Sequence, residues 1–173
     1  RSNTMSNLLV QNIKHTNGTT AQTIDSSGRV LNPIKPAFLA VYNNNAWSTG
    51  SNGTVVPFDD VSSNDCFDLQ SNFVTGTNRF VVPVAGMYYF YYHCYTHNSD
   101  ATSTFKFRKN GSDLEGPGQQ GFTVQSGEDA GTDSTATDII VIKLDVDDYV
   151  QVFFGAQGDL YGYLSRFGGY LIG

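Results

Sequence analysis

The stretch that decides the fold is "RFVVPVAGMYYFYYHCY", residues 79 to 95. A strand at a protein surface usually alternates apolar and polar residues, because one face meets the core and the other meets water. Here both faces are apolar or aromatic. One face carries Tyr88, Phe90, Tyr92 and Cys94, and the other carries Met87, Tyr89, Tyr91, His93 and Tyr95. The second face therefore needs a cover of its own.

The rest of the chain predicts an all-β fold. Among 173 residues there are 18 Gly and 5 Pro, and 13% are aromatic, which favours strands and tight turns. No long window has the 3.6-residue apolar period of a helix. Asn52-Gly53 and Asn110-Gly111 are typical of tight turns. The expected strands are 37–42, 54–58, 79–84, 87–95, 103–109, 122–126, 136–144, 149–155 and 161–172. Short strands at this spacing predict an antiparallel sandwich or jelly roll.

A sandwich accounts for only one face of the 87–95 strand, because that face packs on the opposite sheet. The other face would expose Met87, Tyr89 and Tyr91 as an apolar patch of roughly a few hundred Å². Another copy of the chain is the simplest cover, and several aromatics from each copy would make an obligate interface.

Residues 1–35 are predicted to be a separate segment. Between residues 8 and 32, short apolar pieces are broken by Asn-Gly and Ser-Gly, which is too little to form a core. Such a segment is stable only when it packs on copies of itself or on a larger assembly. Pro33 and Pro36 stiffen a linker before the main domain, residues 36–173.

Charge and hydropathy exclude several partners. The net charge of -6 disfavours nucleic acid, and the one close basic group, Lys106, Arg108 and Lys109, is interpreted as a solvated strand end. No segment is long and apolar enough to cross a bilayer or to act as a signal peptide. For Cys66 and Cys94 a free, buried Cys94 thiol is favoured, and a bridge between the two is the alternative.

The motifs of common enzymes are absent, so we predict no catalytic residues and no enzyme activity. "GPGQQG" at 116–121 matches a dinucleotide-binding motif in letters alone, since no helix pattern follows it. His93 and His97 share a strand face but stand roughly 13 Å apart, too far to hold one metal ion. No Gly-x-Ser-x-Gly motif is present, and the only glutamates are Glu115 and Glu128.

Acidic residues cluster in three places, and carboxylates are suitable calcium ligands. Their spacings match no calcium-binding loop, so turns and solvated edges are the favoured roles, with calcium as an alternative. No other cofactor is expected. The clusters are Asp59-Asp60, then Glu128-Asp129 with Asp133, then Asp145-Asp147-Asp148.

One set of spacings resembles the aromatic signature of the C1q globular domain. Its members here are Asp68, Phe73, Phe80, Gly86, Tyr88, Phe90 and Tyr92. The first position of the signature differs from the family pattern, because the residue here is Ser62 and a Phe is expected. "PAFLAVY" at 36–42 is similar to the family's opening strand. The end of the chain, with Phe167 and Gly169, is similar to its closing strand.

The resemblance implies a ten-stranded jelly roll, shared with tumour necrosis factor, that assembles as a tight trimer. It also implies that the aromatic strand lies in the sheet facing the threefold axis, and that some relatives hold calcium near that axis. The expected trimer interface is then Met87, Tyr89, Tyr91, His93 and Tyr170.

The leader "LLVQNIKHTNGTTAQTIDSSGRV", residues 8–30, resembles segments before C1q-like domains in virion proteins of marine tailed phages, especially those infecting cyanobacteria. This implies a knob on a phage fibre or capsid, located in the virion and joined to other virion proteins through residues 1–35. A host-surface glycan is a candidate partner, and 43–53, 97–103 and 111–135 are the candidate binding loops. The alternative is a secreted C1q-domain lectin that binds carbohydrate.

Overall fold

The computed structural model describes residues 9–32, 34–63, 65–97, 103–114, 123–125 and 133–173. The chain separates into two compact units, Arg1–Lys35 and Pro36–Gly173.

The first unit is a small antiparallel sheet of β1 (Asn12–Lys14), β2 (Thr20–Ile24) and β3 (Val30–Leu31), in the order β1-β2-β3. Asp25 closes the β2–β3 turn by accepting hydrogen bonds from the backbone N–H groups of Ser27 and Arg29, both at 2.9 Å. The apolar side chains of this sheet remain exposed, Leu9 by 92% and Val30 by 57%. The sheet therefore has no core of its own within residues 9–32.

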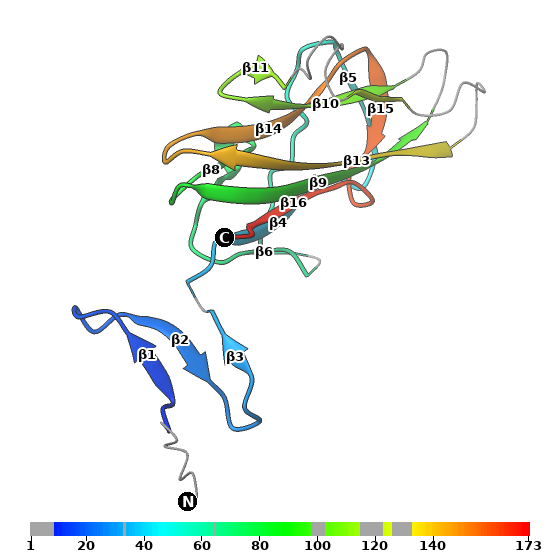
Figure 1. Ribbon diagram of the computed structural model, residues 1–173. Helices are drawn as coiled ribbons and strands as arrows, with labels where there is room; N and C mark the ends of the chain where they lie inside the picture. The colour runs from blue at the N-terminus through cyan, green and yellow to red at the C-terminus, as the bar shows by residue number, and fades with distance from the viewer. Residues whose placement is uncertain (1–8, 33, 64, 98–102, 115–122, 126–132) are drawn as a thin grey trace, which may run out of the picture. The chain divides into compact units, whose positions relative to one another are not determined.

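The second unit is a two-sheet jelly-roll sandwich (Figure 1). The first sheet has the order β13-β9-β16-β4-β6, and the second has the order β11-β10-β14-β8-β7 with β12 beside β10. The first sheet contains β4 (Ala37–Val41), β6 (Phe67–Asp68), β9 (Gly86–His97), β13 (Asp133–Leu144) and β16 (Arg166–Leu171). The second contains β7 (Phe73–Val74), β8 (Arg79–Val81), β10 (Thr104–Lys109), β11 (Ser112–Asp113), β12 (Thr123–Gln125) and β14 (Tyr149–Phe154).

A further pair, β5 (Trp47–Gly50) and β15 (Gly158–Tyr161), lies at one end of the sandwich (Figure 1). Among the residues described, one short 3-10 turn, Thr75–Thr77, is the only helical element. The expected all-β jelly roll is confirmed.

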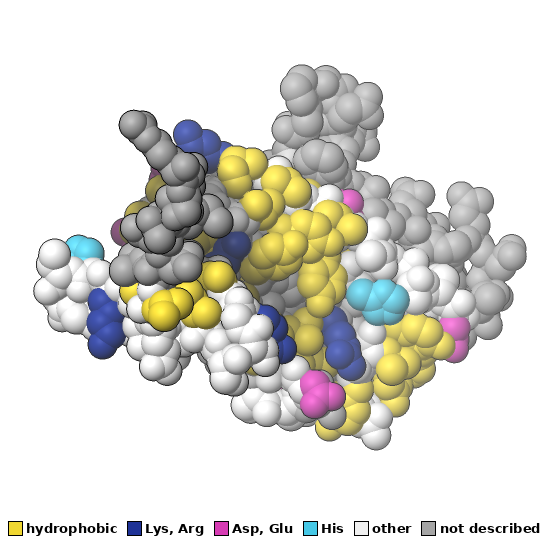
Figure 2. All heavy atoms as spheres, turned by 60° about the horizontal axis from the view of Figure 1, so that its bottom comes forward, with side chains coloured by type: hydrophobic (Ala, Val, Ile, Leu, Met, Phe, Trp, Pro, Cys, Tyr) yellow, Lys and Arg dark blue, Asp and Glu magenta, His cyan; other side chains and the backbone are white. Residues whose placement is uncertain are grey.

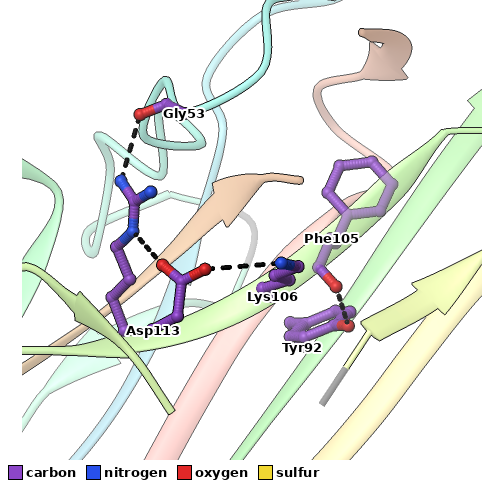
Figure 3. Close-up of polar contacts among 6 residues, drawn as sticks. Gly53, Tyr92, Phe105, Lys106 and Asp113 are labelled. Carbon is purple, nitrogen blue, oxygen red and sulfur yellow. Dashed lines mark hydrogen bonds and ion pairs between the residues drawn. The ribbon is translucent and has the colours of Figure 1, made fainter. Parts of the chain in front are cut away.

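Aromatic rings from both sheets form the core. Phe38 stacks on Phe80 with ring centroids 4.8 Å apart and meets Phe167 edge-on at 4.9 Å. Tyr92 is fully buried, and its hydroxyl donates to the Phe105 carbonyl at 3.0 Å (Figure 3). The face predicted to pack inside, Tyr88, Phe90, Tyr92 and Cys94, is buried throughout.

Several strand predictions need correction. Residues 54–58 form no strand and contribute one isolated bridge, Val55 to Phe153. The stretch 79–84 is a strand only to Val81. The stretch 161–172 is divided by a turn that the Ser165 N–H closes on the Gly162 carbonyl at 2.9 Å. A single strand could not follow both β15 and β16, because they belong to different sheets.

Two further predictions concern side chains. No disulfide joins Cys66 to Cys94, so the alternative of a bridge between them is wrong. The basic group at 106–109 is paired rather than simply solvated. Asp113 pairs with Lys106 at 3.3 Å and with Arg108 at 2.9 Å, and Arg108 lies 3.4 Å above the Phe153 ring (Figure 3 shows the two ion pairs). The charges lie at the edge of the second sheet because Asp113 on β11 is in register with Arg108 on β10.

Candidate functional site

The outer face of the first sheet carries an aromatic and aliphatic area that none of the described strands of the second unit covers. Strand β9 contributes every second residue to it, β16 contributes Tyr170, and β13 adds Ile139 and Val141, in register with Tyr91 and Tyr89. Figure 2, turned so that the lower strands of Figure 1 come forward, shows hydrophobic side chains gathered in a large area. We call Met87, Tyr89, Tyr91, Ile139, Val141 and Tyr170 the outer-face patch.

The patch is well packed within itself and still open to solvent. The rings of Tyr89 and Tyr170 stack with centroids 5.1 Å apart, and Tyr91 follows at 6.3 Å from Tyr89. Tyr170 is 45% exposed and Val141 is 55% exposed. Apolar groups so close together in water favour a partner that covers them.

The polar end of the patch contains His93. Its Nδ1 lies 3.0 Å from the hydroxyl of Thr137 on β13, and Arg166 on β16 is in register with it. Burial raises the pKa of Tyr91, and the charge of Arg166 opposes this rise. All five residues predicted for the trimer interface therefore lie on one face, and their role as an interface stays a prediction.

The signature residues have structural roles. Asp68 accepts hydrogen bonds from the backbone N–H groups of Asn72 at 3.1 Å and Phe73 at 2.8 Å, which closes the turn that places Phe73 in the core. A Cβ at Gly86 would lie 2.7 Å from Cδ1 of Leu171, so only glycine fits there without movement. Phe80, Tyr88, Phe90, Tyr92 and Phe167 are fully buried.

Gly169 has a similar reason to be glycine. A Cβ on it would lie 2.7 Å from the carbonyl oxygen of Tyr89 and would collide with the Phe90 ring. The small residue lets β16 approach β9 at the point where Tyr170 reaches the outer face.

Asp60 of the first acidic cluster and Asp148 of the third act as turn caps, whereas Asp133 of the second lies at the start of β13 and accepts from the Tyr95 hydroxyl. Asp60 accepts hydrogen bonds from the hydroxyl and backbone N–H groups of Ser62 and Ser63, and these bonds lower its pKa to about 2. Asp148 accepts from Lys109, Asn110 and the Asp145 N–H, and its pKa is also about 2. Within the described residues no group of three His, Cys, Asp or Glu is placed to hold a metal ion. Glu128, Asp129, the "GPGQQG" segment and the His97 side chain lie outside the described residues.

A second site was missed by the sequence analysis. A hollow of about 490 Å³ is lined by Asn45, Trp47, Tyr95, Asp133, Tyr161, Tyr163 and Leu164. These residues come from four separate parts of the chain, so no local pattern joins them. The one available signal was the single tryptophan, which lies in the candidate binding loop 43–53.

The comparison with protein families decides the classification. The C1q domain matches residues 37–172. The chain belongs to the C1q domain family. Solved structures with the same fold include the globular domain of zebrafish complement 1qA, with a TM-score of 0.60 and 21% identity over 80% of this chain and 98% of that one.

Two further solved structures also match in fold. Eiger TNF from S. frugiperda has a TM-score of 0.60 and 15% identity over 80% of this chain and 93% of that one. Murine APRIL has a TM-score of 0.53 and 14% identity over 80% of this chain and 99% of that one. No curated protein sequence matches the chain. No helix among the described residues is long and apolar enough to cross a membrane.

Proposed function

We propose that the protein is a non-enzymatic, homotrimeric binding module, displayed as a C1q-like knob on a phage fibre or capsid. The observation that carries this proposal is the outer-face patch. It lies on the sheet that the family resemblance turns toward a threefold axis, and three copies meeting there would bury it. C1q domains generally act as trimeric binding modules rather than as enzymes.

Residues 1–35 serve as the anchor to other virion proteins. The three-stranded sheet of this unit leaves Leu9, Ile13, Val30 and Leu31 exposed, so it gains stability when other surfaces cover them. The resemblance of residues 8–30 to leaders of phage virion proteins supports the virion as its location.

A secreted lectin with the same trimeric domain is the second candidate. The aromatic hollow around Trp47 favours it, because exposed aromatic rings beside carboxylate and amide groups suit a small polar ligand. The two candidates share the trimer and differ in where the protein is found.

The trimer is tested by light scattering on the full chain at micromolar concentration. We expect three times the chain mass of 18.9 kDa. Replacing both Tyr89 and Tyr170 with Ser should give the single-chain mass, because the stacked pair at the centre of the patch is lost. Val74→Ser, a change at an exposed apolar residue on the second sheet, is the control and should leave the trimer intact. A single-chain mass for the unmodified protein would contradict the proposal.

Location is tested by immunogold labelling of particles from the source culture with an antibody against residues 37–173. Gold on capsids or fibres is expected. Unlabelled particles, with the antigen in the soluble secretion, would replace the virion role with that of a secreted lectin.

A further inference from the structure

Within the described residues, β13 is the one long strand at an edge of the two main sheets. It spans twelve residues, Asp133–Leu144, and pairs with β9 along its whole length. Figure 1 shows β13 and β9 as two long neighbouring arrows. No described strand pairs with the other side of β13, which we call its open side. The remaining edge strands of these sheets, β6, β7, β11 and β12, have two or three residues each. A long open edge offers N–H and C=O groups to another extended chain, whereas a very short edge offers few.

Asp138 occupies one of the N–H groups on this open side. Its Oδ1 accepts the N–H of Ile139 at 2.7 Å. On the paired side β9 lies about 4.8 Å away, which leaves no room for a side chain between the two backbones. The Ile139 N–H therefore points to the open side, and so do those of Thr137 and Val141, because every second residue of a strand bonds to the same side. A strand that approached this edge would find its central donor already bonded.

The same carboxylate brings a charge to the core side of the edge. Its Oδ2 is buried and has no hydrogen-bond partner among the described residues. Its neighbours along the core side of β13 are Ala136 and Ile140, both buried and apolar. A strand added beside Asp138 would move the carboxylate further from water, and burying a charge without a partner is unfavourable. A charged residue that points inward on an edge strand is one of the ways in which natural sheets avoid further pairing.

The place of Asp138 along the strand acts against one partner in particular, a second copy of β13. Asp138 is the sixth of the twelve residues, at the middle of the strand. Two copies that continued one sheet, with both cores on the same side, would have to pair residues of the same face. The antiparallel register that pairs residues 133–143 with the same residues of a second copy places Asp138 opposite its own counterpart. Side chains directly opposite each other have Cβ atoms about 5 Å apart, and like charges there are destabilising.

From these contacts we infer that the open side of β13 is a docking edge for β13 of a second copy, and that the Asp138 carboxylate keeps this edge closed. A second copy fits the edge because it offers a strand of equal length with the same alternation of core-facing and outward residues. The role gives a reason for a buried carboxylate that lowers the stability of the domain, since specificity against wrong pairing is commonly gained at such a cost. The inference goes beyond the proposed function, because it concerns the edge of the first sheet and not the outer-face patch.

The test measures the molar mass of full-chain variants by light scattering over a range of concentrations at pH 7. Asp138→Asn removes the charge and keeps an acceptor for the Ile139 N–H, whereas Asp138→Val removes both. We expect both variants to form species of at least twice the mass of the unmodified chain, with Asp138→Val associating at about tenfold lower concentration. Asp147→Asn, which removes a charge from an exposed turn, is the control and should keep the unmodified mass. An unchanged mass for Asp138→Val at every concentration would overturn the inference.

A second substitution checks that the new contact is the edge of β13. Thr135 is exposed, and its N–H points to the open side as that of Ile139 does. Thr135→Pro removes this donor, which only an added strand would use, and proline is tolerated on the solvent side of an edge strand. Combined with Asp138→Val it should restore the unmodified mass, and association that persists would place the contact elsewhere and overturn the inference.

Circular dichroism on the same samples verifies the fold. If Asp138→Val does not fold, Asp138→Asn with and without Thr135→Pro gives the same comparison. Every mass is compared with that of the unmodified chain, so the result does not depend on whether that chain is a trimer. An unmodified chain of single-copy mass would contradict the trimer alone, and a trimer whose Asp138 variants do not associate further would contradict the docking edge alone.

Discussion

The ring of Tyr91 covers the backbone of Gly168 on the neighbouring strand. A Cβ at Gly168 would lie 2.7 Å from Cε1 of Tyr91 and 3.0 Å from its hydroxyl oxygen. The two residues are directly opposite in the β9–β16 register, on the outer face of the sheet. Gly168 therefore lets the Tyr91 ring lie close to the backbone of β16, which determines how far this ring projects from the outer face of the sheet.

Gly168→Ala should weaken the proposed trimer while leaving the fold intact. The added methyl group meets only the far end of a flexible side chain, so Tyr91 can move outward, and its moved ring no longer matches the partner surface. We expect the trimer to dissociate at about tenfold higher concentration, measured by sedimentation.

The adjacent substitution Gly169→Ala is the contrasting control. Its methyl group would meet the Tyr89 carbonyl oxygen at 2.7 Å and the buried Phe90 ring, neither of which moves freely. Urea unfolding should show a loss of about 2 kcal/mol or more. Equal effects of the two substitutions on assembly and on stability would contradict the division between outer face and core.

Tyr92→Phe should destabilise the domain by about 1 kcal/mol. The Tyr92 hydroxyl crosses from the first sheet to the Phe105 carbonyl on the second, at 3.0 Å in the core. The substitution removes this bond between the sheets and leaves the ring in place. Tyr163→Phe, on an exposed turn, is the control and should stay within about 0.5 kcal/mol of the unmodified chain in urea unfolding. Equal stability of the two variants would show that the inter-sheet bond contributes nothing.

Acid should destabilise the domain through Asp60 and Asp148. Both carboxylates have a pKa of about 2 in the folded chain against a model-peptide value of 3.8. The unfolded state thus binds protons first as the pH falls, and the stability present above pH 3.8 is lost toward pH 2. Asp60→Asn should reduce stability at pH 7 and flatten the curve between these values, as measured by thermal unfolding at a series of pH values. A curve as steep as that of the unmodified chain would exclude Asp60 as a source of the acid sensitivity.

The fold could be predicted because the aromatic residues of the 87–95 strand indicate a core on one face of the strand and a second apolar surface on the other. Tyr88, Phe90 and Tyr92 had to face a core, and the same strand also had apolar residues on its outer side. Gly86 and Gly169 fit the signature for a reason that the structure makes physical, since a side chain at either position meets its neighbours. The strand at 54–58 was predicted wrongly because a β-branched pair before a proline satisfies the pattern without forming a ladder.

The hollow around Trp47 could not be predicted in the same way. Its members come from distant parts of the chain: Tyr161 and Asn45, which are joined by a hydrogen bond, are 116 residues apart. Periodicity within one strand says nothing about which strand ends meet at the end of a sandwich. The short strand β5 has no alternating apolar pattern, so the position of Trp47 depends on its pairing with Tyr161 in β15.

Asp138 is an acidic residue at a partly buried position, where its charged form is unfavourable. It lies on β13 between the buried Ala136 and Ile140, in register with Tyr92. Its Oδ1 accepts the N–H of Ile139 at 2.7 Å, while its Oδ2 is buried without a hydrogen-bond partner in the described residues. Burial raises the pKa of this carboxyl above 3.8, against the opposing effect of the Ile139 N–H.

The raised pKa of Asp138 determines whether the stability of the domain rises or falls with pH. The folded chain binds the Asp138 proton more tightly than the unfolded chain, so stability falls as the pH rises from 3.8 through the folded pKa. Asp138→Asn removes the buried charge and should raise the free energy of unfolding at pH 7 by about 1 kcal/mol. Below pH 3.8 the variant and the unmodified chain should be equally stable, because both side chains are then neutral. Asp147→Asn, in an exposed turn with φ of 68°, is the control and should change neither value. A loss of stability in Asp138→Asn at pH 7 would mean that the Asp138 charge has a stabilising partner.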